Sequence, residues 1–178
     1  MKKILFLSAF LCVQIFVHAQ FNVGGNAILQ FPQGDFKNIS KFGYGGNASV
    51  GYTFDQRIDL SFVYTNYWYG ESIGEFKLNS KTVEAKFFFL NGITRPYIGC
   101  GVGLFTEIFE GDSFPRQTEN NWGVEPKIGA LFDSKVLKKL FIDASLSWLR
   151  DDLTGRGPNA INLSVGLKYM IDFKKGNM

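Results

Sequence analysis

Apolar and polar residues alternate along most of the chain beyond residue 19. The alternation is most regular at residues 160–173, where seven apolar side chains occupy the odd positions and mainly polar or small ones the even positions. A period of two residues is typical of β-strands whose two faces meet different surroundings. The sequence predicts eight such strands, at residues 21–31, 42–54, 57–68, 81–90, 97–108, 122–132, 140–148 and 160–173.

The lengths of the strands and of their connections indicate a membrane protein. Each run has about 9–13 residues, whereas an average strand has about 5–6 and a strand that crosses a bilayer needs about 9–11. Shorter connections lie at residues 55–56, 91–95 and 135–139, and long polar ones at 32–41, 69–80, 110–121 and 150–159. Short turns at one end and long loops at the other are typical of outer membrane barrels. We therefore expect a periplasmic N-terminus and four long loops outside the cell.

The amount of apolar surface suggests which face of the strands points outward. Four to seven apolar residues on each of eight strands are more than so small a barrel can enclose. In water such a surface would aggregate, whereas lipid can solvate it. Glycines on the polar face leave room for large inward side chains such as Tyr67, Phe88, Tyr97 and Phe105. The pattern favours an all-β fold, an eight-stranded antiparallel up-and-down transmembrane β-barrel, over the alternative of a soluble lipocalin-like barrel.

Aromatic residues gather where such a barrel would meet the membrane surfaces. Trp68, Trp122 and Trp148 lie on the apolar face at the long-loop end, and Tyr169 and Phe173 at the opposite end. Outer membrane barrels carry aromatic girdles at both interfaces, so we expect these five residues to be membrane-interface aromatics. In lipid no backbone group can stay unpaired, so the first strand should pair with the eighth and close the sheet.

The first 19 residues have the features of a secretory signal peptide. Lys2 and Lys3 precede an apolar run at residues 4–17, and Val-His-Ala at 17–19 fits a cleavage site before Gln20. We expect residues 1–19 to be cleaved and residues 20–178 to form the barrel domain. This leaves 17 basic and 16 acidic side chains, a balance that argues against nucleic acid as a partner. Cys100 would be the one remaining cysteine, so no intrachain disulfide is expected.

Charged residues on the polar face form the candidate site of the predicted barrel. Because buried charges must be paired, we expect a lumen polar network that fixes the strand register and closes the barrel. A narrow path for ions or solutes is the alternative that the same charges allow. The network comprises Asp59, Glu84, Lys86, Glu107, Glu125, Lys127, Asp143, Lys168 and Asp172.

The residues that catalysis would require are missing from the predicted mature chain. The single histidine is His18, inside the predicted signal peptide, so a mechanism with histidine as general base is excluded. One cysteine without histidine also argues against a zinc site. We expect no catalytic residues, no cofactor and no metal.

Three stretches resemble a known group of proteins: residues 31–36 (FPQGDF), 43–46 (GYGG) and 95–104 (RPYIGCGVGL). They are similar to parts of the small eight-stranded outer membrane β-barrel proteins of Gram-negative bacteria. The resemblance implies outer membrane lipid as surroundings and the barrel assembly machinery as the partner during insertion, with Phe173 at the end of the insertion signal. It names no surface ligand. We expect a non-enzymatic outer membrane protein, structural or surface-binding through its extracellular loops; a narrow pore or transporter for small solutes is the alternative.

Overall fold

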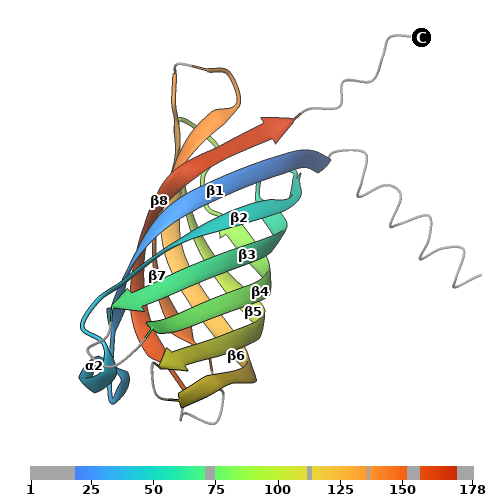
Figure 1. The fold of residues 1–178 in the computed structure, drawn as a ribbon. Helices are drawn as coiled ribbons and strands as arrows, with labels where there is room; N and C mark the ends of the chain where they lie inside the picture. The colour runs from blue at the N-terminus through green and yellow to red at the C-terminus, as the bar shows by residue number, and fades with distance from the viewer. Residues whose placement is uncertain (1–18, 71–74, 112–113, 136, 152–156, 172–178) are drawn as a thin grey trace, which may run out of the picture.

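The chain folds into a single closed β-barrel (Figure 1). The computed structural model describes residues 19–70, 75–111, 114–135, 137–151 and 157–171. The predicted signal peptide lies outside these ranges, apart from Ala19 at the start of the first strand. In chain order the elements are β1 (Ala19–Pro32), α2 (Phe36–Ile39), β2 (Gly43–Phe54), β3 (Ile58–Gly70), β4 (Glu75–Phe88), β5 (Thr94–Gly111), β6 (Phe114–Asp133), β7 (Leu140–Arg150) and β8 (Asn159–Ile171).

Each strand pairs antiparallel with its neighbours in sequence, and the sheet closes between its first and last strands. β1 pairs with β8 from Phe21 opposite Ile171 to Pro32 opposite Ala160. The predicted eight-stranded antiparallel up-and-down barrel is confirmed. None of the helices in the described ranges is long and apolar enough to cross a membrane.

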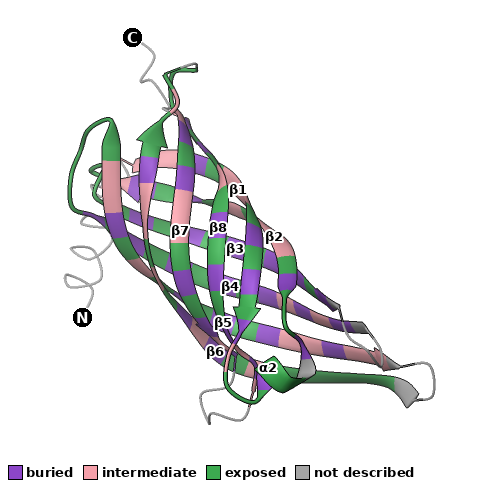
Figure 2. Cartoon of the chain, turned by 90° about the vertical axis from the view of Figure 1, so that its left-hand side faces the viewer, coloured by how far each residue is buried: buried purple, intermediate pink, exposed green. Residues whose placement is uncertain are grey.

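The two faces of the strands are sorted as the sequence predicts for a membrane barrel. Inner positions, mostly buried, alternate with exposed outer positions along the strands of the barrel wall, whereas residues 116–120 at the start of β6 are all exposed (Figure 2). The exposed positions carry large apolar side chains, among them Phe62, Val83 and Leu167, while Asp59 and Lys168 are buried inside. A lipocalin-like barrel would have the opposite arrangement, so that alternative is wrong.

Glycines on the inner face leave space for aromatic rings, as expected. A Cβ atom built on Gly129 would lie 2.6 Å from the hydroxyl oxygen of Tyr97, and one on Gly45 would lie 2.8 Å from the ring of Tyr67. Both distances are too short for a real contact. The two rings can therefore occupy these positions only because glycine has no side chain. Small and large residues thus alternate across the lumen and fill it.

The short connections lie together at one end of the barrel. Between β2 and β3, Asp55 and Gln56 both have positive φ angles, 46° and 56°, and Arg57 N–H donates to the carbonyl oxygen of Phe54 over 2.9 Å. Two successive positive φ angles are characteristic of type I′ turns, whose twist matches that of the flanking strands. This end is called the turn end below, and the opposite one the loop end.

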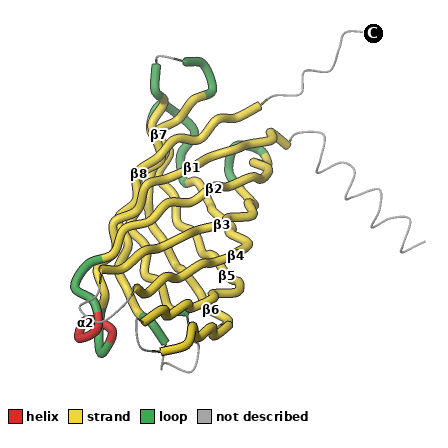
Figure 3. The backbone as a smooth tube through the Cα atoms, viewed as in Figure 1, coloured by secondary structure: helices red, strands yellow, loops and turns green. Residues whose placement is uncertain are grey.

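At the loop end the structure corrects two predicted loops. Residues 69–80 are mostly strand, because β3 continues to Gly70 and β4 begins at Glu75. Residues 110–121 are mostly strand as well, in the extended hairpin of β5 and β6. Their polar composition had indicated loops, but backbone pairing continues above the apolar band because it does not require apolar side chains. The predicted loop at 32–41 contains one unexpected helical turn, α2, whose Phe36 is buried (Figure 3).

Candidate functional site in the barrel lumen

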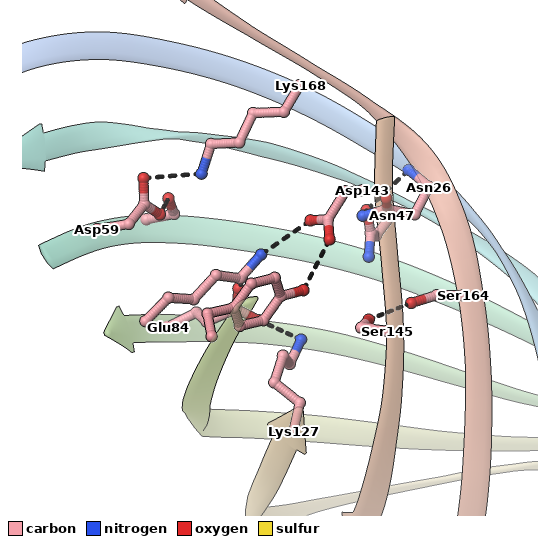
Figure 4. Close-up of polar contacts among 12 residues, drawn as sticks. Asn26, Asn47, Asp59, Glu84, Lys127, Asp143, Ser145, Ser164 and Lys168 are labelled. Carbon is pink, nitrogen blue, oxygen red and sulfur yellow. Dashed lines mark hydrogen bonds and ion pairs between the residues drawn. The ribbon is translucent and has the colours of Figure 1, made fainter. Parts of the chain in front are cut away.

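The structure brings seven of the nine predicted lumen residues together inside the barrel. Figure 4 labels Asp59, Glu84, Lys127, Asp143 and Lys168 among them. Glu107 lies apart from them, nearer the loop end, where it is half-buried and accepts a 2.9 Å hydrogen bond from Asn121. Asp172 lies outside the described residues. The seven come from five strands and are Asp59, Glu84, Lys86, Glu125, Lys127, Asp143 and Lys168.

Two lysines share one carboxylate in the larger group of ion pairs. Glu84 lies between Lys86, whose Nζ is 2.9 Å from its Oε1, and Lys127, which contacts its Oε2. Lys86 also donates to Asp143 Oδ2 over 3.1 Å. Tyr97 donates to the other oxygen of Asp143 over 2.7 Å, and Lys86 lies 4.8 Å from the centre of the Tyr97 ring. This chain of charges links β4, β5, β6 and β7.

A second group is built around Asp59, which is fully buried. Its carboxylate accepts hydrogen bonds of 2.6–2.7 Å from four side chains on four different strands. Charge-assisted bonds of this length are among the stronger ones in proteins. The donors are Asn22, Thr53, Ser61 and Lys168.

Neutral groups line the lumen beside the larger ionic group. Glu125 accepts hydrogen bonds from Ser147 over 2.5 Å and from Asn162 over 3.2 Å. The hydroxyl oxygens of Ser145 and Ser164 lie 2.6 Å apart. The cavity that remains there has a volume of about 10 Å³, which is the space of roughly one water molecule.

Apolar clusters occupy both ends of the lumen. The loop-end cluster consists of Ile28, Phe36, Tyr67, Tyr69, Phe76, Leu78, Phe105 and Leu149. The turn-end cluster consists of Phe88, Tyr97, Leu131, Phe141 and Met170. Phe36 of α2 packs its ring at 5.0 Å from that of Tyr69 and 5.4 Å from that of Phe76. The helical turn therefore adds an aromatic ring to the packing at the loop end.

The chemistry of the lumen is that of paired charges. Four carboxylates face three ammonium groups, and each ammonium group contacts at least one carboxylate. Within the described ranges no three His, Cys, Asp or Glu residues are grouped so as to hold a metal ion. Sequence reasoning missed the neutral partners Asn22, Asn162 and Thr53, although their inward positions in the alternating pattern mark them as lumen residues.

The predicted interface aromatics point away from the lumen. Trp68, Trp122, Trp148 and Tyr169 are all exposed, and Phe173 lies outside the described residues. Trp68 stacks on Tyr44 of the neighbouring strand with a centroid distance of 5.9 Å.

An open groove lies outside the barrel, on its apolar outer face. It has a volume of about 690 Å³ and is lined by apolar side chains that include Ile98, Ile128 and Trp148. Pro126 also lines the groove, at the point where the register between β6 and β7 skips two residue pairs. Proline has no N–H to donate to a ladder, which accounts for the interruption.

Comparison with solved structures shows the same fold in small outer membrane barrels. Neisserial surface protein A (NspA) is 18% identical with a TM-score of 0.71, over 85% of this chain and 97% of that one. Ail of Yersinia pestis is 17% identical with a TM-score of 0.56, over 86% and 97%. The N-terminal β-barrel domain of Pseudomonas aeruginosa OprF is 20% identical with a TM-score of 0.54, over 85% and 99%. No model of a known protein family matches the chain, and no curated protein matches it. The likeness is one of fold.

Proposed function

We propose that this protein resides in the outer membrane as a closed, non-enzymatic barrel that serves a structural or surface-binding role. Its exposed apolar band would be solvated by outer membrane lipid. The likeness in fold to NspA and Ail supports this placement. The proposal includes export by the signal peptide at residues 1–19 and insertion by the barrel assembly machinery.

The observation that carries the proposal is the filling of the lumen from end to end. A solute would have to pass two apolar clusters and the ion pairs of Glu84 and Asp59. Opening such a path would separate buried charges from their partners, and each separation costs several kcal/mol. The arrangement supports a barrel that spans the membrane without conducting, rather than a narrow pore.

A non-enzymatic role is supported by the partners of the polar groups. Ser147 donates to Glu125, but the predicted mature chain has no histidine to act as general base. The remaining acidic groups of the lumen are engaged by lysines or by neutral donors.

Planar-bilayer recordings test the closed lumen. Folded protein, verified by its heat-modifiable mobility on gels, would be inserted alongside a wide-pore porin as a control for insertion. We expect steady conductance steps from the porin and none from this protein. Steady single-channel steps from the folded wild-type protein would overturn the closed-barrel proposal in favour of the pore. Recovery of the mature protein from the periplasm without detergent would overturn the membrane placement.

A further inference from the structure

The ladder between β6 and β7 is interrupted at one place in the barrel wall. Pairs are present at Lys127 opposite Ser147 and at Val124 opposite Arg150, whereas the two pairs between them are missing. One of the two missing pairs is that of residue 126 with residue 148, because the register is the same on both sides of the interruption. These two residues, Pro126 and Trp148, also line the open groove on the outer face.

The hydrogen bonds at the turn end show which way the backbone groups of the two strands point. Ser134 N–H donates to the carbonyl oxygen of Leu140 over 3.1 Å, so these two residues face each other across the seam between β6 and β7. Asp133 N–H donates instead to the carbonyl oxygen of Ile93 over 2.8 Å, on the side of β5. Backbone groups point to alternate sides along a strand, so the even-numbered residues of β6 and β7 face their common seam.

The carbonyl group of Trp148 therefore points at a residue that cannot donate to it. Residue 148 is even, and the register from Asp133 opposite Phe141 to Val124 opposite Arg150 contains no inserted residue that would change its direction. Opposite it lies Pro126, which has no N–H. A carbonyl group without a donor is costly in apolar surroundings. A molecule in the groove that carries a donor would remove this cost.

The groove has the size and the lining that an acyl chain requires. Its volume of about 690 Å³ lies within the range of ligand sites, about 300–1,000 Å³. Ile98, Ile128 and Leu146 supply an apolar lining, and Gln33 and Trp148 line the part nearest the loop end. Trp148 belongs to the aromatic residues expected at the membrane interface. Its carbonyl group therefore lies close to the level of the lipid headgroups.

We propose that this groove binds the hydroxylated acyl chain of a lipid in the outer leaflet, and that the chain hydroxyl donates to the carbonyl oxygen of Trp148. The inference rests on the proposed function, which places the groove in that leaflet. The ester groups of an ordinary phospholipid only accept hydrogen bonds, so they cannot serve this carbonyl. A hydroxyl group near the carboxyl end of a chain is a donor at the right depth. Because the groove lies outside the barrel, a lipid can enter it sideways with its headgroup still at the membrane surface.

Lipid titration in nanodiscs tests the proposal. The host lipid is dimyristoyl phosphatidylcholine, which has no hydrogen-bond donor. The probe is a phosphatidylcholine with one 3-hydroxytetradecanoyl chain brominated near its methyl end, and its control is the same lipid without the hydroxyl. Trp68→Phe and Trp122→Phe leave Trp148 as the one tryptophan, so that bromine quenching reports lipid in the groove. We expect the probe to reach half-maximal quenching at about a tenfold lower mole fraction than the control, the equivalent of one hydrogen bond.

Two proline substitutions in this background form a matched pair. Pro126→Ala supplies an N–H opposite Trp148, so the tenfold preference for the hydroxylated chain should disappear while the control lipid binds as before. Pro96→Ala on β5 should keep the preference. The backbone of Pro96 faces β4, where its carbonyl oxygen accepts from Phe89 N–H over 3.0 Å.

Three results would overturn the proposal. Equal quenching by probe and control would mean that the groove recognises no donor on the chain. A tenfold preference that survives Pro126→Ala would mean that the hydroxyl binds somewhere other than the carbonyl of Trp148. Free 3-hydroxytetradecanoic acid that displaces the probe at an equal mole fraction would identify a free hydroxy acid as the occupant in place of a membrane lipid. None of these results affects the conductance or fractionation experiments, so the proposed function would fail or stand separately.

Discussion

The two faces of β8 show how one strand meets two different surroundings. On its outer face Val165 is 53% exposed, with Leu163 and Leu167 beside it. On its inner face Lys168 is 3% exposed and bonds to Asp59 over 2.7 Å. A soluble protein places the apolar face inside and the charge outside. Here the order is inverted, because lipid solvates the apolar side chains and the packed lumen solvates the charge.

The comparison shows that the same residue type has opposite effects on the two faces. An inward lysine is tolerated because a carboxylate compensates for its lost hydration. An outward lysine in the same strand would have lipid as its only surroundings. Stability therefore depends on pairing inside the barrel and on hydrophobicity outside it, and each face can be tested separately.

The largest effect should come from removing the carboxylate at the centre of an ionic group. Asp59→Leu leaves Lys168 buried without its partner and removes the acceptor of three neutral donors. We expect the free energy of unfolding to fall by about 3–5 kcal/mol, as for other broken buried pairs. Urea-induced unfolding in lipid vesicles, followed by tryptophan fluorescence, measures the change.

The double variant Asp59→Leu, Lys168→Met is the control for this prediction. It removes both charges, so most of the lost stability should return. If the double variant were as unstable as Asp59→Leu alone, the loss would come from packing rather than from an unpaired charge.

A charge placed on the outer face should have the next largest effect. Val165 lies near the middle of β8 and faces outward. Val165→Lys should cost about 2–4 kcal/mol, the range for lysine at the midplane of a bilayer. The matched control is Tyr169→Lys, nearer the turn end of the same face, where the cost should fall to about 0–1 kcal/mol. Equal costs at both positions would mean that the loss of stability caused by a lysine on the outer face of β8 does not depend on membrane depth.

The inversion also explains which parts of the structure the sequence could predict. The alternation in β8 shows which of its residues lie on each face. Eight such runs predict a closed barrel, because every backbone group in lipid needs a partner. The contacts inside the lumen are harder to predict, because they join residues far apart in sequence, such as Asp59 and Lys168. Alternation shows that both point inward but not that they meet. The extended hairpin of β5 and β6 was mistaken for a loop because polarity was read as irregular structure.

The smallest effect should come from a neutral pair in the same lumen. Ser145 and Ser164 lie on β7 and β8 with their hydroxyl oxygens 2.6 Å apart. Ser145→Ala removes one hydrogen-bond partner without exposing a charge, so we expect a loss of about 0.5–1.5 kcal/mol. The variant that also carries Ser164→Ala should be no less stable than the single one, since no hydroxyl is left without its partner. A loss as large as that of Asp59→Leu would show that lumen stability depends on close packing throughout, and that charge pairing is not what distinguishes the inner face from the outer one.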